Sequence, residues 1–335
     1  MAALKADDIR PRRLMRDQTA SMQADIAFLQ GNRDRFVDAA CPACDSSARR
    51  PLYRKYDLEH VVCDHCATQY IAPRPDAELL SEFYAQSANY SYWAKEIFPA
   101  SAEVRRERIF QPRAERVRDL VARHPIGGTM IEVGAGFGLF CDEVRKLGLF
   151  SRIVGIEPTP DLARICRDLG FECHETSYEK APIGGRAGLI AAFEVIEHLF
   201  SPKAFLEWCF ATLAPGGAVL MTCPNIAGFE TLCLGERSET VDHEHLNLFN
   251  PASLALLAER VGFRGIEVTT LGRLDVDIVR SALADGTVTT SDLGPFAGHL
   301  LASEDDDVLE RLQDFLSEAK LSSNMQLVAF RPAGA

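Results

Sequence analysis

Two pairs of cysteines near the start of the sequence have the spacing of a metal site. Cys41 pairs with Cys44 and Cys63 pairs with Cys66, with eighteen residues between the pairs. Each Cys-x-x-Cys turn can aim two sulfurs at one point, so two turns supply the four thiolates of a tetrahedral zinc site. Such a zinc ion is structural, because no position is left for a substrate. We expect no fifth ligand from His65. A redox pair or two disulfides are the alternatives.

Glycines at alternate positions follow a run of apolar residues. The segment 129–133 predicts a buried strand, and Gly134, Gly136 and Gly138 come directly after it. Glycine permits a tight turn and lets the backbone approach a ligand closely. The acid Glu157 ends the next predicted strand, about 20 residues further on, where nucleotide-binding folds hold ribose hydroxyls. The sequence therefore predicts a cofactor that contains a nucleoside.

These residues resemble the class I S-adenosylmethionine-dependent methyltransferases, in which an acid precedes G-x-G-x-G and a second acid closes the second strand. The turn Leu213–Gly217 is similar to the L-x-P-G-G turn of that family. The resemblance implies S-adenosylmethionine as cofactor. Its expected contacts are Glu132, Gly134, Ala135, Gly136, Phe137, Gly138, Glu157, Pro158, Phe193 and Glu194. Leu139 replaces the last glycine of the dinucleotide pattern, which disfavours a nicotinamide enzyme. A tight turn without a ligand is the other alternative.

Acids and histidines gather in the segment 242–245, Asp-His-Glu-His. An imidazole titrates near pH 6.5, so His245 could accept a substrate proton as a methyl group arrives. The segment resembles the Tyr-His-Glu-His element that supplies the acid/base pair in C-methyltransferases of nucleotide-linked deoxysugars, which also carry a zinc ribbon. Asp242 stands where that family has tyrosine. The expected catalytic residues are His245, Glu244 and His198. The alternative is a loop that only positions a helix.

The resemblance implies methyl transfer to a small polar metabolite, such as a nucleotide sugar, a glycan precursor or a natural-product intermediate. Glu194, Glu197 and His198 suggest a second function, because similar E-x-x-E-H segments bind a divalent cation in ubiquinone-pathway and small-RNA methyltransferases. A metal-assisted RNA or quinone-type O-methyltransferase is therefore an alternative, with magnesium as a further candidate cofactor. A non-catalytic cofactor-binding scaffold is the third, although the glycine loop and Glu157 are intact.

The composition narrows the range of partners. The 335 residues are 47% hydrophobic and carry a net charge of −12. An acidic surface disfavours nucleic acid, and no apolar run reaches the roughly 18 to 20 residues that span a membrane. We expect a cytoplasmic protein with a small-molecule substrate; the oligomeric state is not constrained. The arginines of segment 104–123 alternate with acids and predict a solvated helix face with ion pairs.

Strands alternate with helices from residue 126 onward. The predicted strands are 129–133, 152–157, 171–175, 188–193, 218–223, 263–271 and 325–331. This order predicts an α/β, doubly wound, Rossmann-like sheet of seven strands with helices on both faces. We predict four parts: a helical lead-in (1–37), a zinc ribbon (38–72), a helical cap (73–125) and a cofactor-binding domain (126–335) with an inserted helical segment (about 272–324).

Overall fold

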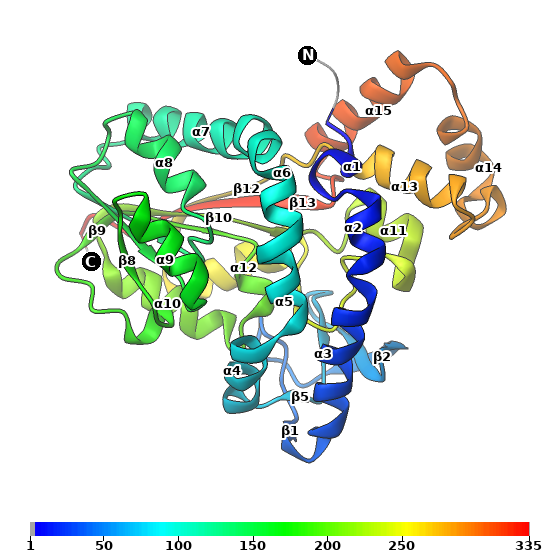
Figure 1. Cartoon of the computed structure of the whole chain (residues 1–335), viewed down its shortest axis with the longest axis horizontal. Coiled ribbons are helices and arrows are strands. Elements are labelled where there is room, and N and C mark those ends of the chain that lie inside the picture. Colours follow the sequence, from blue (N-terminus) through cyan, green and yellow to red (C-terminus); the bar gives the residue numbers. More distant parts are fainter. Residues whose placement is uncertain (1–3, 335) are drawn as a thin grey trace.

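A seven-stranded sheet forms the centre of the computed structural model, which describes residues 4–334 (Figure 1). Its strand order is β12-β13-β10-β9-β6-β7-β8. The bounds are β6 (Thr129–Val133), β7 (Arg152–Ile156), β8 (Glu172–His174), β9 (Ala187–Phe193), β10 (Leu213–Pro224), β12 (Arg264–Thr270) and β13 (Asn324–Phe330). Only β13 runs antiparallel to its neighbours. The predicted Rossmann-like sheet is confirmed, and β10 additionally includes the predicted L-x-P-G-G turn as an irregularity between Leu213 and Ala218.

Apolar residues on both faces of the sheet explain why helices cover both faces. Along β9, Leu189 and Ala191 face one core, whereas Ile190 and Ala192 face the other. The first core is closed by α7 (Gln111–Arg123), α8 (Leu139–Lys146) and α9 (Pro160–Asp168), and the second by α10 (Pro202–Thr212) and α12 (Pro251–Val261). The alternation is the period-2 pattern of a strand buried on both sides.

In Figure 1 the lead-in helices run from beside α6, at the height of the sheet, down to the cysteine module, which lies below the sheet. The lead-in comprises α1 (Ala6–Ile9), α2 (Arg12–Asp17), α3 (Thr19–Gly31) and η1 (Arg33–Arg35). The module's sheet has the order β11-β4-β3-β2, while β1 (Phe36–Val37) pairs separately with β5 (Arg74–Pro75). Its strands are β2 (Arg49–Lys55), β3 (Leu58–Cys63), β4 (Gln69–Ile71) and β11 (Asn247–Leu248). The last of these strands, β11, directly follows the predicted reactive segment 242–245 in the chain. The module is therefore not built from residues 38–72 alone.

A series of helices connects the module to the sheet. They are α4 (Ala77–Gln86), α5 (Ala88–Tyr92), η2 (Trp93–Ile97), α6 (Phe98–Arg105) and η3 (Arg106–Phe110), followed by α7. The expected solvated arginine face is wrong for part of this stretch. The Arg113 side chain is 13% exposed, and Arg106 pairs with Asp142 and Glu143 of α8 rather than with acids of its own helix.

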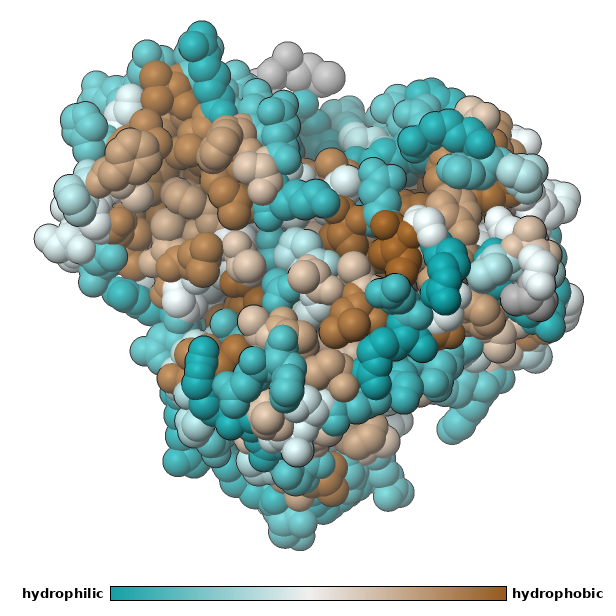
Figure 2. All heavy atoms as spheres, turned by 180° about the vertical axis from the view of Figure 1, so that it is seen from behind, coloured by the Kyte–Doolittle hydropathy of each residue, from teal (hydrophilic) through white to brown (hydrophobic). Residues whose placement is uncertain are grey.

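The predicted helical insertion forms a small core of its own. It contains α13 (Asp275–Ala284), α14 (Thr290–Leu301) and α15 (Asp306–Glu318), which pack with α11 (Phe229–Leu234). The back of the molecule shows an apolar area on the side where this insertion lies (Figure 2), and Phe296 is 81% exposed. Within residues 4–334, no helix combines the length and apolar character needed to cross a bilayer. The remaining short helices are η4 (Tyr178–Lys180), η5 (Ile196–His198) and η6 (Gly235–Arg237).

Candidate functional site

The glycine loop follows β6 and turns with three left-handed residues. Gly134, Gly136 and Gly138 have φ angles of 74°, 53° and 70°, a region that side chains disfavour. A Cβ atom on Gly134 would lie 2.8 Å from a methyl carbon of Val195, whereas one on Gly136 would meet no atom within 4 Å. The loop is therefore packed on one side and open above Gly136, which is the arrangement that a closely approaching ligand requires.

Glu157 lies directly beside this loop. Its carboxylate accepts hydrogen bonds from the backbone N–H groups of Gly136 and Thr159, each at 2.9 Å. Burial raises the pKa of Glu157, although the two N–H donors oppose the shift. Each carboxylate oxygen has two lone pairs, so both oxygens can still accept a hydroxyl hydrogen. The residues therefore fit a ribose-bearing cofactor whose remaining part passes over Gly136.

Two other predicted cofactor residues stabilise the loop. Glu132 is buried below it and accepts a hydrogen bond from the thiol of Cys141 at 3.0 Å. Burial raises the pKa of Glu132 to about 8. Phe137 packs on Phe98 of the helical cap, with ring centroids 5.2 Å apart. The loop is thus held from below by α8 and covered from the side by α6.

A polar cluster closes the end of β9 next to the loop. Glu194 has a φ of 55° and accepts hydrogen bonds from Thr222 at 2.5 Å and Asn324 at 3.1 Å. The guanidinium of Arg113 lies 3.5 Å from this carboxylate and 4.2 Å from the ring centroid of Phe193. The partners of Glu194 come from three distant segments of the chain, namely Arg113, Thr222 and Asn324. Sequence patterns alone identify none of them as part of the site.

The predicted catalytic histidines lie side by side. The rings of His198 and His245 have centroids 4.7 Å apart. Nδ1 of His245 lies 2.7 Å from the backbone carbonyl of Thr240, and Nδ1 of His198 lies 3.2 Å from that of Glu244. A carbonyl oxygen only accepts, so we assign the hydrogen to Nδ1 in both rings. This tautomer leaves the lone pair on Nε2 of each ring, the atom that a general base uses.

The helical cap supplies three further polar residues to this cluster. The hydroxyl of Tyr84 lies 3.1 Å from Nδ1 of His198, and the amide of Asn89 donates to the Glu244 carboxylate at 2.6 Å. Tyr90 packs edge-on against Tyr84 at 5.5 Å. Burial raises the pKa of Tyr90, and the charges of Glu244 and Glu157 add to the shift. Tyr90 therefore packs against Tyr84, whose ring in turn contacts His198.

Burial dominates the electrostatics of the reactive cluster. It raises the pKa of Glu244 to about 7, and the charge of Asp242 adds to that shift. It lowers the pKa of His198 to about 3, which keeps this imidazole neutral at physiological pH. Asp242 behaves in the opposite way to Glu244, because its buried ion pair with His243 overcomes the cost of burial and lowers the pKa of Asp242. The cluster thus combines the neutral imidazole of His198 with the Glu244 carboxyl group, which can hold a proton.

Part of the E-x-x-E-H segment forms a compact donor set. Glu197, His198 and His245 place one ligand atom each within 4.8 Å of one another. Glu197 is 1% exposed, and neither of its carboxylate oxygens has a hydrogen-bond partner among residues 4–334. Glu194 is absent from this set and is bonded to Thr222 and Asn324 instead.

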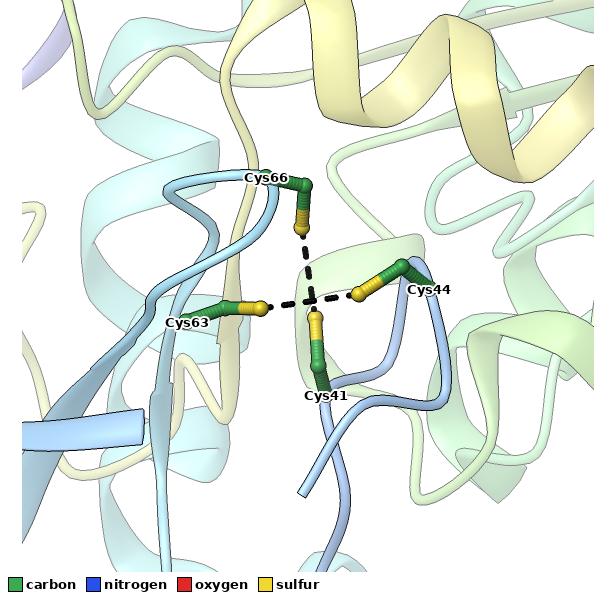
Figure 3. Close-up of side chains that lie close together, drawn as sticks. All are labelled: Cys41, Cys44, Cys63 and Cys66. Carbon is green, nitrogen blue, oxygen red and sulfur yellow. Dashed lines mark hydrogen bonds between the residues drawn. The ribbon is translucent and has the colours of Figure 1, made fainter. Parts of the chain in front are cut away.

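The four paired cysteines converge as their spacing predicts. Figure 3 shows their sulfur atoms pointing at a common centre, with 3.4 Å between Cys41 and Cys66 and 3.5 Å between Cys44 and Cys63. Four sulfurs at bond lengths of about 2.3 Å from a zinc ion would lie about 3.8 Å apart. The donor set therefore fits a structural zinc ion, with no position left for a substrate. His65 is exposed on the turn between the last two cysteines.

Comparison with known proteins identifies the central part of the chain. Residues 103–268 match a protein family described as "Methyltransferase domain". This segment is a methyltransferase domain. The segment includes the glycine loop, Glu157 and both histidines of the reactive cluster. It does not include the four paired cysteines or the helical insertion.

Two curated relatives and one solved structure extend this comparison. C-methyltransferase NovU of Streptomyces niveus is 27% identical over 53% of this chain and 42% of its own length. A ubiquinone biosynthesis O-methyltransferase of Bradyrhizobium sp. (strain ORS 278) is 31% identical over 30% of this chain and 41% of its own length. The chain thus spans less than half the length of each relative. A chain in the complex of the Haloferax volcanii Trm112 methyltransferase activator and a methyltransferase shares the fold, with a TM-score of 0.50, 16% identity and coverage of 72% and 97% of the two chains.

Proposed function

We propose that the methyltransferase domain transfers the methyl group of S-adenosylmethionine to a small polar metabolite, with His245 as the general base. A nucleotide-linked sugar is the first substrate class to test. The observation that carries the proposal is the His198–His245 pair, whose rings lie 4.7 Å apart on the segments that follow β9 and β10. The likeness to the C-methyltransferase NovU supports a carbon acceptor, although Asp242 departs from the tyrosine of that family.

The chain's own residues divide the work of binding and proton transfer. Glu157 and the glycine loop hold the cofactor, which supplies an electrophilic methyl group when bound. The substrate nucleophile attacks the methyl carbon as the carbon–sulfur bond breaks, so S-adenosylhomocysteine leaves as a neutral thioether. Nε2 of His245 accepts the proton that the substrate nucleophile loses. Tyr84 and Glu244 position the adjacent His198 ring through the contacts at its Nδ1 atom.

The experiment follows the methyl group. The purified chain is incubated with S-adenosylmethionine that carries a ¹³C methyl group and with separate fractions of nucleotide sugars, glycan precursors and small aromatic metabolites. We expect the label in a fraction of polar metabolites, with an equal amount of S-adenosylhomocysteine. Label found only in a quinone-like fraction would replace this substrate class. Cofactor binding without transfer to any fraction would favour the scaffold function.

A second candidate function is metal-assisted O-methylation. The buried donor set of Glu197, His198 and His245 favours it, because two imidazoles and a carboxylate suit a transition-metal ion better than magnesium. Here the metal would polarise the acceptor hydroxyl, and His245 would be a ligand instead of a base. Electron paramagnetic resonance of added Mn²⁺ tests the candidate. A bound-Mn²⁺ signal that disappears in Glu197→Gln would support it, and free Mn²⁺ alone would exclude it.

A further inference from the structure

The reactive segment continues directly into the sheet of the cysteine module. β11 begins two residues after His245, and its register pairs Asn247 with Tyr70 and Leu248 with Gln69 of β4. The N–H of Ile71 also donates to the carbonyl of Leu246 at 3.0 Å. The backbone next to His245 is therefore an edge strand of the module, although it is distant from the module in sequence.

Two asparagines add side-chain connections between these regions. Asn250 donates to the backbone carbonyl of Cys66, one of the four tetrad cysteines, at 2.9 Å. Asn247 is fully buried and accepts from Arg74, which follows β4, at 2.8 Å. The same amide donates to the carbonyl of Leu199 at 2.7 Å, close to His198. Asn247 thus connects the module to the segments that carry both histidines of the reactive cluster.

The position of β4 depends in turn on the second cysteine pair. The turn between β3 and β4 is closed by the N–H of Cys63 donating to Thr68 at 2.9 Å and by that of Ala67 donating to Cys63 at 3.0 Å. Segments as short as this module rarely build an adequate core, and a structural metal commonly supplies the missing stability. Without the metal, the turn that positions β4 loses its main constraint.

We propose that zinc at the cysteine tetrad sets the position of residues 242–250, which contain the reactive segment 242–245 and β11. Loss of the metal would then disable methyl transfer but preserve cofactor binding. The catalytic consequence rests on the proposed function, whereas the coupling between metal and segment does not. The cofactor loop is held by separate contacts, because Gly134 and Ala135 donate to Ile156, and Gly136 donates to Glu157. These contacts belong to β7 and its end, which do not pair with the module.

The coupling must act in both directions. If zinc stabilises the docked segment, the docked segment must raise the affinity for zinc by the same factor. Asn250→Ser tests this without removing a metal ligand. Serine keeps the N-cap of α12 but cannot reach the Cys66 carbonyl. Asp305→Ser is the matched control, because it makes a similar cap substitution on α15, in the helical insertion.

The experiment combines four readouts on the full chain: zinc content, hydrogen exchange, cofactor affinity and competition with a chelator. Elemental analysis should find about one zinc per chain, lost in Cys41→Ser. Zinc removal should speed hydrogen exchange in 242–250 at least tenfold, while exchange in β6 and the dissociation constant for S-adenosylmethionine stay within threefold. At equilibrium with a competing chelator, Asn250→Ser should bind zinc at least threefold more weakly than Asp305→Ser.

Several results would overturn the proposal: a chain without zinc, unchanged exchange in 242–250 after zinc removal, or cofactor binding lost together with the metal. If the metal-free chain unfolds completely, the chelator assay decides, and equal zinc affinity of the two serine variants overturns the proposal. A failure to methylate any acceptor would count against the proposed function alone, since none of the four readouts measures turnover.

Discussion

The cofactor loop and the reactive cluster of this protein are built in opposite ways. The loop and its acid come from one continuous stretch, in which the Glu157 carboxylate accepts hydrogen bonds from N–H groups within about one βαβ unit. The reactive cluster instead combines Tyr84 and Asn89 of the cap with His198 after β9 and the segment 242–245. Cofactor binding is therefore a local property of the sheet edge, whereas proton transfer depends on how separate parts of the chain dock.

The largest expected effect comes from removing the proposed base, His245, which tests whether proton transfer and cofactor binding are separate. His245→Ala should lower the rate of methyl transfer about 100- to 10,000-fold, the usual contribution of a positioned general base. The dissociation constant for S-adenosylmethionine should change less than threefold. Single-turnover transfer of a labelled methyl group measures the rate, and His65→Ala is the control because that histidine is exposed in the cysteine module. A His245→Ala enzyme with normal turnover would refute the base assignment.

A second prediction concerns the buried acid below the cofactor loop. Burial raises the pKa of Glu132 to about 8, well above its value in an unfolded chain. The folded state therefore favours the protonated acid, and its contribution to stability is complete below about pH 4.5 and is lost as the pH rises through about 8. In Glu132→Gln, the fall in the free energy of unfolding between pH 6 and pH 8.5 should be about 1–3 kcal/mol smaller than in the wild type.

Urea unfolding at the two pH values measures this difference. Glu78→Gln is the control, because the Glu78 side chain is 85% exposed. If wild type and Glu132→Gln lose the same stability as the pH rises, Glu132 titrates as an ordinary surface acid. The loop would then not rest on a buried neutral carboxyl group.

The smallest predicted effect concerns the helical cap and tests whether the Tyr84 hydroxyl contributes to the reactive cluster. Tyr84→Phe removes the hydroxyl beside Nδ1 of His198 but leaves the bond from that ring to the Glu244 carbonyl. Loss of one such hydrogen bond is worth about 1 kcal/mol, so methyl transfer should slow about five- to tenfold with unchanged cofactor affinity. Tyr92→Phe is the matched control, since its hydroxyl donates to Leu14 outside the cluster. Equal effects of the two variants would show that Tyr84 has only a packing role.

The difference between the local cofactor loop and the docked reactive cluster also explains which features could be predicted from the sequence. The seven strands, the glycine loop and the cysteine tetrad follow from short-range patterns, namely apolar runs, alternate glycines and C-x-x-C spacing, and the structure confirms the fold that they imply. Arg113 was misread as part of a solvated face because its neighbours in sequence are charged. Its burial against Phe193 is a consequence of how α7 crosses the end of β9.

The remaining contacts of the site depend on tertiary docking. Asn89 donates to Glu244 across 155 positions of the chain, and Asn250 reaches Cys66 across 184. The local sequence does not reveal either contact, because an amide side chain becomes functional only when distant carbonyl or carboxylate groups are brought to it. The role of β11 in the module's sheet was hidden for the same reason, since a two-residue strand has no periodicity to detect.

The most direct test of the division between the two regions is calorimetric titration of S-adenosylmethionine into three proteins: the wild type, His245→Ala and Glu157→Ala. We predict that His245→Ala binds the cofactor within threefold of the wild type, while Glu157→Ala shows no saturable binding at concentrations up to about 100 times the wild-type dissociation constant, a loss of about 2.7 kcal/mol or more. Tight binding by Glu157→Ala, or loss of binding in His245→Ala, would contradict this division of the molecule.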